Sequence, residues 1–347
     1  MTAPRKVYIE TTTRCNLRCD KCIKQIKNNG ILEGDLAFEV FENILPDLSS
    51  VDQLVLNGIG EPLLHPDLEK MIRAARRVMP KKSSIGFQTN GLLMTAERAE
   101  KLIDAGLSTV CFSLDSLAEN GGNGSCKALP CVNHVSKGLQ NLQEAARNSE
   151  KNLTYGLEIV VSKSNISELT KMVTWAVEHS VEYILVSHLF PYDDEMSAES
   201  LFSFNSETAL AVYRKWQIKA EDLGIDLCPE GKAYLGFSRT PRQNMTLDLL
   251  REMYKEATAK NIRMHGETLI TVQPEQARRT QDIFDKAQAI AEAEAISLSL
   301  PPLAAQDLRQ CPFMGENAAF VSFHGEVMPC HFVWHTYPCM AGTEIIS

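Results

Sequence analysis

The sequence predicts an α/β protein with a parallel sheet, and three features of the first half of the chain indicate this class. Strand-like and helix-like stretches alternate, the strand-like stretches are short and apolar, and the pattern is repeated six times. Repeated units of this kind place helices outside a parallel sheet. Six units are compatible with a barrel or a partial barrel, although periodicity alone does not separate a barrel from an open, doubly wound sheet.

The bounds of the expected elements follow from this alternation and from residues that end helices. Pro46 interrupts the first helical stretch, because proline cannot continue a helix. Thr95 is a suitable N-cap for the third helix, and Gly106 is a suitable residue to end it. Strands are expected at residues 7–12, 53–57, 84–88, 108–114, 157–161 and 183–187, and the helices between them at 36–45, 68–78, 96–105, 133–147 and 167–179.

The pattern changes after Pro191, so we expect three parts. Residues 1–200 hold the strand and helix units. Residues 201–304 are expected to form a helical connecting region without a chemical motif, with helices at 208–223, 247–259 and 274–295. In residues 305–347, two short strands at 318–323 and 326–328 flank a His324-Gly325 turn, which indicates a hairpin.

Composition limits the partners and the compartment. The chain has 347 residues, 44% of them hydrophobic and 23% charged, which is typical of a globular protein. Its net charge of −9 argues against nucleic acid, whose binding proteins usually show a basic face. We see no secretory signal and no apolar run long enough to cross a bilayer, so we expect a cytoplasmic protein without a membrane partner. In that compartment, the ten cysteines are expected to be metal ligands or free thiols rather than disulfides.

Three of these cysteines, Cys15, Cys19 and Cys22, directly follow the first expected strand at spacings of four and three. Three thiolates on one short loop can hold three irons of a [4Fe–4S] cluster, which leaves the fourth iron without a protein ligand. A zinc site would need a fourth ligand, usually from a second Cys or Cys/His pair, and no such pair lies nearby. The alternative is three ordinary reduced cysteines, which would require a chance cluster within eight residues.

This Cys-x3-Cys-x2-Cys motif after a first strand resembles the signature of the radical S-adenosylmethionine (SAM) enzymes. The resemblance implies a partial (β/α)6 TIM-like barrel with SAM at the C-terminal ends of the strands. It also implies that the open iron of a [4Fe–4S] cluster binds SAM, and that reductive cleavage of SAM gives methionine and a 5′-deoxyadenosyl radical. An electron donor such as flavodoxin or ferredoxin would supply the electron. One residue departs from the family pattern: Lys21 precedes Cys22, where an aromatic residue that packs near adenine is common.

The resemblance continues at the ends of the second and third strands. Gly60 and Glu61 lie in a Gly-Ile-Gly-Glu-Pro segment that resembles the Gly-Gly-Glu motif of the family, with Ile59 in place of one glycine. In the family, that motif binds the methionyl amine of SAM. Asn90, in a Thr-Asn-Gly segment, is implied to be a further polar contact to SAM, although Asn-Gly is also a common turn pair.

The fourth and sixth strands end in further candidates. Strand alternation puts Ser113 and Asp115 on one face, where the resemblance implies contact with the carboxylate or ribose of SAM. His188 is a candidate acid, base or ligand contact, or else a structural histidine. The arginine expected next in the family is missing, and Lys127 or Lys137 could take its place. Cys126 and Cys131, nearby, could be ligands, although free thiols fit a loop better.

Cysteines also flank the expected hairpin of the tail. Cys311 and Cys330 resemble the start of the SPASM and twitch extensions, which hold auxiliary [4Fe–4S] clusters in radical SAM enzymes that modify peptides and proteins. Cys339 is a candidate third ligand, and His331 and His335 are weaker ones. The dense run of further cysteines of a full SPASM domain is missing before Ser347, so one auxiliary cluster is implied, on a shortened or truncated extension.

The amino-acid sequence of the tail, from Phe320 onward, is most similar to that of proteins described as metalloenzyme maturases. The resemblance therefore implies a radical SAM enzyme that modifies a peptide or protein substrate, to mature another enzyme. Two alternatives stay open: a radical SAM enzyme that acts on a small-molecule cofactor precursor, and an iron–sulfur protein without turnover.

Overall fold

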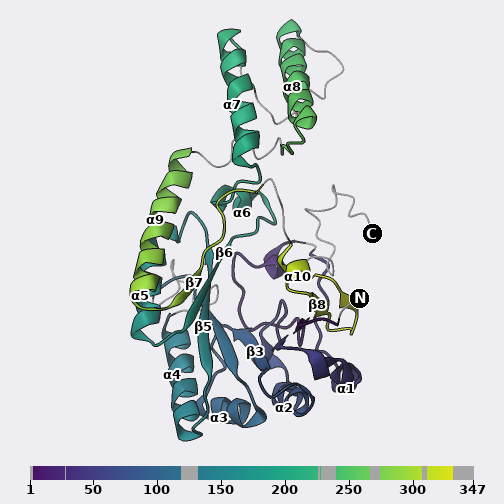
Figure 1. The fold of residues 1–347 in the computed structure, drawn as a ribbon, viewed down its shortest axis with the longest axis vertical. Coiled ribbons are helices and arrows are strands. Elements are labelled where there is room, and N and C mark those ends of the chain that lie inside the picture. Colours follow the sequence, from purple (N-terminus) through teal and green to yellow (C-terminus); the bar gives the residue numbers. More distant parts are fainter. Residues whose placement is uncertain are drawn as a thin grey trace.

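An open, mostly parallel sheet organises the molecule (Figure 1). The structure is a computed structural model that describes residues 3–27, 29–118, 132–225, 227, 240–265, 274–306 and 311–330. Across these residues, nine strands lie in the order β7-β6-β5-β4-β3-β2-β1-β8-β9, and neighbours are parallel except for the antiparallel pair β8 and β9. The strands are β1 Lys6–Ile9, β2 Gln53–Val55, β3 Ser84–Thr89, β4 Thr109–Ser113, β5 Thr154–Val161, β6 Tyr183–His188, β7 Ser297–Ser299, β8 Ala318–Val321 and β9 Val327–Met328.

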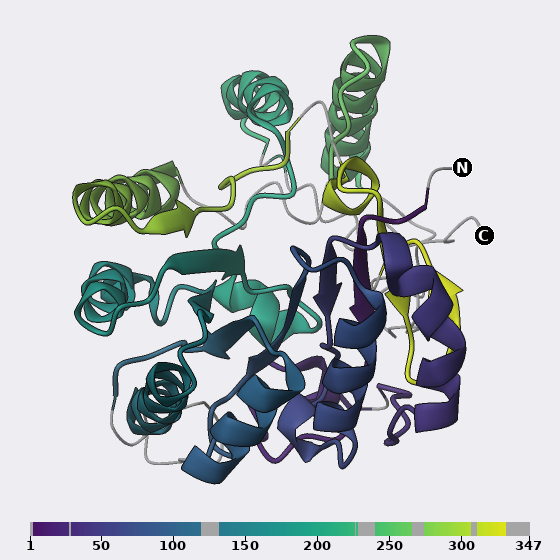
Figure 2. The same ribbon diagram turned by 60° about the horizontal axis from the view of Figure 1, so that its bottom comes forward.

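The predicted α/β class and partial barrel are confirmed. Strands β1 to β6 are the six expected strands, they are adjacent in sequence order, and the sheet does not close on itself. Helices α1 to α5 lie along one face of this sheet (Figure 2). The helices are α1 Phe38–Ile44, α2 Leu68–Val78, α3 Ala96–Ala105, α4 Val132–Asn148, α5 Leu169–Glu178, α6 Asp194–Glu199, α7 Glu207–Asp222, α8 Pro241–Ala259, α9 Pro274–Ala293 and α10 Pro312–Gly315.

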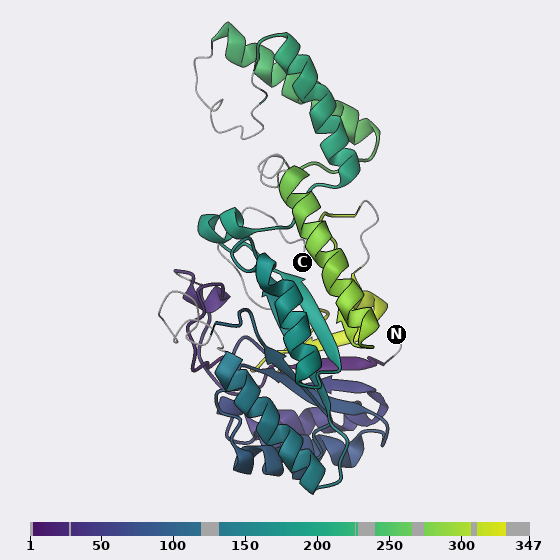
Figure 3. The same cartoon turned by 90° about the vertical axis from the view of Figure 1, so that its left-hand side faces the viewer.

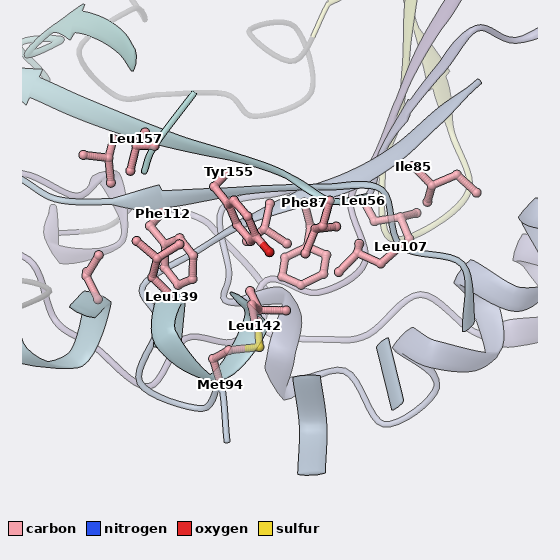
Figure 4. Packing of buried hydrophobic residues seen from close by; sticks show 14 of the residues in the cluster. Leu56, Ile85, Phe87, Met94, Leu107, Phe112, Leu139, Leu142, Tyr155 and Leu157 are labelled. Carbon is pink, nitrogen blue, oxygen red and sulfur yellow. The ribbon is translucent and has the colours of Figure 1, made fainter. Parts of the chain in front are cut away.

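Alternation along the strands separates an apolar face from a polar one. Phe87, Phe112 and Leu157, from β3, β4 and β5, are buried and face the helices, where Leu139 and Leu142 of α4 pack against them (Figure 4). Neighbouring strand residues point to the opposite face, because successive side chains alternate. That opposite face carries polar residues such as Gln88, Ser113 and Glu158. These side chains are not covered by helices α1 to α5, so they could contact a ligand.

The structure adds α6 and β7 to the expected elements, and it shows where the expected helix α9 packs. Asp193 begins α6, because its side chain accepts a hydrogen bond from the backbone N–H of Met196 at 2.8 Å. Strand β7 pairs in parallel with β6 and extends the sheet. Helix α9 packs against α5, and its buried Phe284, Ala287 and Ala291 join the main core. The proposed division at residues 200 and 304 stays a prediction, and α9 and β7 lie with the barrel although they fall between these boundaries.

Helices α7 and α8 form a separate pair that projects from the sheet (Figure 3). They hold a small core of their own, which includes Trp216 and Met253. Thr240 begins α8 with a capping box, and Pro241 occupies the first turn, so this helix starts earlier than expected. Among the described helices, none is long and apolar enough to cross a membrane.

The predicted hairpin of the tail is confirmed as β8 and β9, with Gly325 at a φ of 88° in the turn. Strand β8 also pairs in parallel with β1, from Lys6 opposite Ala318 to Ile9 opposite Val321. The extension is therefore part of the same sheet, beside the strand that leads into the three-cysteine loop.

Candidate functional site

The three clustered cysteines lie on a loop that leaves the C-terminal end of β1. The backbone N–H of Cys22 donates to the carbonyl oxygen of Cys19 at 2.9 Å, which closes a tight turn between these two cysteines. Cys15, Cys19 and Cys22 are all reduced and half-buried. Because β1 to β6 are parallel, this loop lies at the edge of the sheet where the other strands also end.

The electrostatics of the three thiols indicate that they lie near one another. Burial raises the pKa of each, and Cys22 and Cys15 add to the effect at Cys19, whose pKa rises to about 12. Among the described residues, no three His, Cys, Asp or Glu side chains converge on one ion position.

Glu61 connects the ends of β2 and β3. Its side chain is 3% exposed. Oε1 accepts hydrogen bonds from Thr89 Oγ1 at 2.7 Å and from the backbone N–H of Leu63 at 3.1 Å, and Oε2 accepts one from the backbone N–H of Asn90 at 2.8 Å. Burial raises the pKa of Glu61, although these hydrogen bonds oppose the change.

Gly60 brings the β2 loop against the start of the cysteine loop. Its N–H donates to the carbonyl oxygen of Thr12 at 3.2 Å, and the N–H of Glu61 donates to that of Arg14 at 2.8 Å. A Cβ atom at Gly60 would overlap both of these backbone oxygens. A glycine is therefore required here for the two loops to approach this closely.

Asn90 joins β3 to the cysteine loop directly. Its Nδ2 donates to Asn16 Oδ1 at 2.8 Å, and its own Oδ1 accepts from the backbone N–H of Leu92 at 3.0 Å. The side chain is thus a cross-link between two strand ends as well as part of a turn.

Ser113 and Asp115 lie at the end of β4, as expected from alternation. Ser113 Oγ accepts from Gln88 Nε2 at 3.0 Å, and Asp115 Oδ1 accepts from the backbone N–H of Val160 at 2.8 Å. Burial raises the pKa of Asp115, and the charge of Asp115 contributes to the raised pKa of Cys19. The structure therefore brings Asp115 close to the cysteine loop.

His188 lies apart from this group. Its Nε2 is 2.9 Å from the carbonyl oxygen of Pro302, and its ring packs near Phe202 and Phe284. Burial lowers its pKa, which favours the neutral ring. The neighbouring Ser187 faces the polar side of the sheet and donates to Glu158 Oε1 at 3.3 Å.

Residues 9–176 match the family model described as the Radical SAM superfamily. This domain belongs to the radical SAM superfamily. The match runs from the last residue of β1 to α5, so it includes the cysteine loop and the ends of β2 to β5. The family resemblance inferred from the sequence is confirmed.

Relatives with a curated name support the same family. The "Tungsten-containing aldehyde ferredoxin oxidoreductase cofactor-modifying protein" of Pyrococcus furiosus is 29% identical over 230 residues, which cover 64% of this chain and 62% of that protein. The "Fe-coproporphyrin III synthase" of Methanosarcina barkeri is 30% identical over 180 residues, 51% of this chain and 42% of that protein. The chain thus spans less than two thirds of either relative.

A solved structure of similar fold matches nearly the whole chain. Streptococcus suis SuiB bound to precursor peptide SuiA has a TM-score of 0.53 and 12% sequence identity, and the match covers 99% of this chain and 67% of that one. At this identity, the likeness shows a shared fold.

Sequence reasoning missed two charged residues near the cysteine loop. Glu10, at the end of β1, is fully buried and accepts from the backbone N–H groups of Ile59 at 3.1 Å and Phe323 at 3.4 Å. Burial raises its pKa to about 8. Lys24 is mostly buried, and its Nζ donates to Thr13 O at 2.5 Å and to Glu33 Oε1 at 2.8 Å. An acid within an apolar strand was the available signal for Glu10.

The tail cysteines are placed only in part. Cys311 is exposed just before α10, and Cys330 is half-buried after β9. Cys339, His331 and His335 lie outside the described residues, as do Cys126, Lys127 and Cys131. Lys137 is exposed on α4. The ligands of an auxiliary cluster therefore stay a prediction.

Proposed function

We propose that this chain is a radical SAM enzyme whose reactive [4Fe–4S] cluster is held by Cys15, Cys19 and Cys22. The observation that carries the proposal is the meeting of this loop with the ends of β2 and β3 through Gly60, Asn90 and hydrogen-bonded backbone groups. When bound, a cluster with an open iron supplies the electron that splits SAM into methionine and a 5′-deoxyadenosyl radical, which removes a hydrogen atom from the substrate.

The residues of the chain would orient SAM at this edge. Gly60, which has no side chain, would leave room for the methionyl end, and Glu61 holds the ends of β2 and β3 together through three hydrogen bonds. Asn90, Ser113 and Asp115 offer polar groups from β3 and β4 beside the loop. His188 stays a prediction as a further contact, since its Nε2 is already hydrogen-bonded to Pro302.

The substrate we propose is a peptide or protein, and the role that of a maturase for another enzyme. Two observations support this role: the sequence of the tail, and the name of the Pyrococcus relative, which is a cofactor-modifying protein. SuiB carries a precursor peptide on the same fold. A small-molecule cofactor precursor is the second candidate, because the Methanosarcina relative is named as a porphyrin synthase.

We further propose one auxiliary cluster, with Cys311, Cys330 and Cys339 among its ligands, and flavodoxin or ferredoxin as the electron donor. The pairing of β8 with β1 supports the position of such a cluster near the barrel. We place the enzyme in the cytoplasm, where thiols stay reduced.

Anaerobic reconstitution with iron and sulfide, followed by reduction in the presence of SAM, tests the proposal. The wild-type protein should release 5′-deoxyadenosine and methionine. Alanine variants of Cys15, Cys19 and Cys22 should release neither above background, whereas Cys111→Ala, which removes a buried thiol of β4, should retain the reaction. A reconstituted wild-type protein with its full iron content but no 5′-deoxyadenosine would contradict an enzymatic role and favour the iron–sulfur protein without turnover.

Two further measurements test the number of clusters and the class of substrate. Iron content should be about eight per chain in the wild-type protein and about four in Cys311→Ala and Cys330→Ala, as one or two cubes require. Deuterium transfer from a labelled candidate peptide into 5′-deoxyadenosine would identify a peptide substrate, and transfer only from a labelled cofactor precursor would identify the second candidate.

A further inference from the structure

Lys21 links the cysteine loop to the far side of the site. It lies one residue before Cys22, and its Nζ donates a hydrogen bond to Ser162 Oγ at 2.7 Å. Ser162 follows β5, 141 positions later in the chain. Lys21 therefore links the cysteine loop to the end of β5. None of the roles proposed above uses this contact.

The acceptor of this hydrogen bond is held firmly. Ser162 is fully buried, and its N–H donates to Asn165 Oδ1 at 2.8 Å. The Nδ2 of Asn165 donates in turn to the backbone carbonyl oxygens of Asp115 at 3.0 Å and Val160 at 2.9 Å. Lys21 is therefore docked on a turn that also fixes the end of β4.

The charge of Lys21 acts on the same region. Burial raises the pKa of Asp115, and the Lys21 ammonium opposes that change. Within the described part of the chain, Lys21 is the cation that acts on Asp115, so it offsets negative charge beside the loop.

We propose that Lys21 is a positioning residue of the cluster site: it docks the cysteine loop on the β4 and β5 ends, and its positive charge favours the reduced cluster. This inference rests on the proposed function, because it needs a cluster on Cys15, Cys19 and Cys22. Reduction adds negative charge to a centre that already carries three thiolates, and net charge is one of the properties that set the potential of such clusters. A nearby cation stabilises the more negative state.

A series of variants separates the two contributions. Lys21→Arg keeps the charge and the donor, Lys21→Gln keeps a donor but removes the charge, and Lys21→Met removes both. Ser162→Ala removes the acceptor and leaves the charge in place. Lys101→Met is the matched control, since Lys101 is an exposed lysine of α3 paired with Glu97.

Two readouts that do not depend on turnover are measured on reconstituted protein without SAM. The midpoint potential, from a redox titration followed by electron paramagnetic resonance, should be more negative in Lys21→Met and Lys21→Gln and near wild type in Lys21→Arg, Ser162→Ala and Lys101→Met. Amide hydrogen exchange across residues 15–25 should be faster in Lys21→Met and Ser162→Ala than in the wild type or the control. If Lys21→Met does not bind a cluster, the effect of the charge is measured by comparing the midpoint potential of Lys21→Gln with that of Lys21→Arg.

The outcomes distinguish this inference from the function on which it rests. A wild-type protein without a cluster would overturn both. A wild-type protein with a cluster, together with unchanged potential and exchange in Lys21→Met, would overturn the inference alone. A Lys21→Arg variant as negative in potential as Lys21→Met would overturn the role of the charge.

Discussion

Asn90 and Asn16 meet through a side-chain hydrogen bond of 2.8 Å, although they lie 74 positions apart in the chain. Asn16 is between the first two cysteines of the loop, and Asn90 follows β3. This contact means that the end of β3 holds the position of the loop.

Replacement of Asn90 by Ala should therefore weaken SAM binding through the loop. The lost hydrogen bond is worth about 1 kcal/mol, which corresponds to about a fivefold weaker affinity. Equilibrium dialysis of SAM against the reconstituted protein measures this change. Asn133→Ala, at an exposed position of α4, is the control and should bind SAM as the wild type does. Equal affinity in Asn90→Ala and the wild type would show that the Asn16 contact does not support the site.

Gly60→Ala should destabilise the fold, because the added methyl group would overlap the backbone oxygens of Thr12 and Arg14. Backbone atoms cannot move aside as a side chain can, so we expect a loss of about 1–3 kcal/mol in the free energy of unfolding. Gly315→Ala is the matched control, since a Cβ there would meet nothing within 4 Å. Chemical denaturation of both variants checks the contrast, and a loss of similar size in the two would refute the close approach of the loops.

Glu10→Gln should change how stability depends on pH. In the folded protein, burial raises the pKa of Glu10 from 4.5 to about 8. The unfolded chain releases this proton near its ordinary pKa, whereas the folded protein keeps it, so the wild type loses stability as pH rises from about 4.5 to about 8. Gln carries no proton to lose and can still accept from the backbone N–H of Ile59.

The melting temperature of Glu10→Gln relative to the wild type should therefore rise steadily between pH 5 and pH 8 in protein without a cluster. The effect is bounded by about 1.4 kcal/mol for each unit of pKa shift. Differential scanning calorimetry at several pH values measures it. Glu294→Gln, at an exposed glutamate after α9, should show no such trend. A constant difference for Glu10→Gln would mean that its carboxyl group is ionised throughout this range.

Local patterns predicted most of the fold and pointed to the cysteine loop as the candidate site. The short apolar strands gave β1 to β6 in order, and the spacing of Cys15, Cys19 and Cys22 was enough by itself to indicate a cluster. Strand β7 was missed because it is three residues long and carries two serines. Helix α6 was missed because its sequence is polar and depends on the Asp193 cap.

The remaining site residues could not be predicted, because their roles depend on contacts between distant segments. Glu10 contacts Phe323 across 313 positions, and Lys21 contacts Ser162 across 141. The sequence alone shows a charged residue in each case, but not its partner. Such contacts follow from the order of strands in the sheet, above all from the pairing of β8 with β1.

The pairing of β8 with β1 leads to a last prediction, on whether the extension and the barrel unfold together. Val321 of β8 is 3% exposed and belongs to the main core, whereas its partner across the hairpin, Val327, is 71% exposed. Val321→Ala should lower the free energy of unfolding by about 2 kcal/mol through lost burial and the cavity left behind. Val327→Ala should change it by less than about 0.5 kcal/mol.

Denaturation followed by far-ultraviolet circular dichroism, and by fluorescence of a dye attached to Cys311, measures both variants. If the extension is part of the barrel core, the two signals should give one coincident transition, which moves to lower denaturant in Val321→Ala. A separate, earlier dye transition, with the main transition unmoved by Val321→Ala, would show that the extension folds as an independent unit. In that case β8 could not transmit the state of a tail cluster to the cysteine loop through β1.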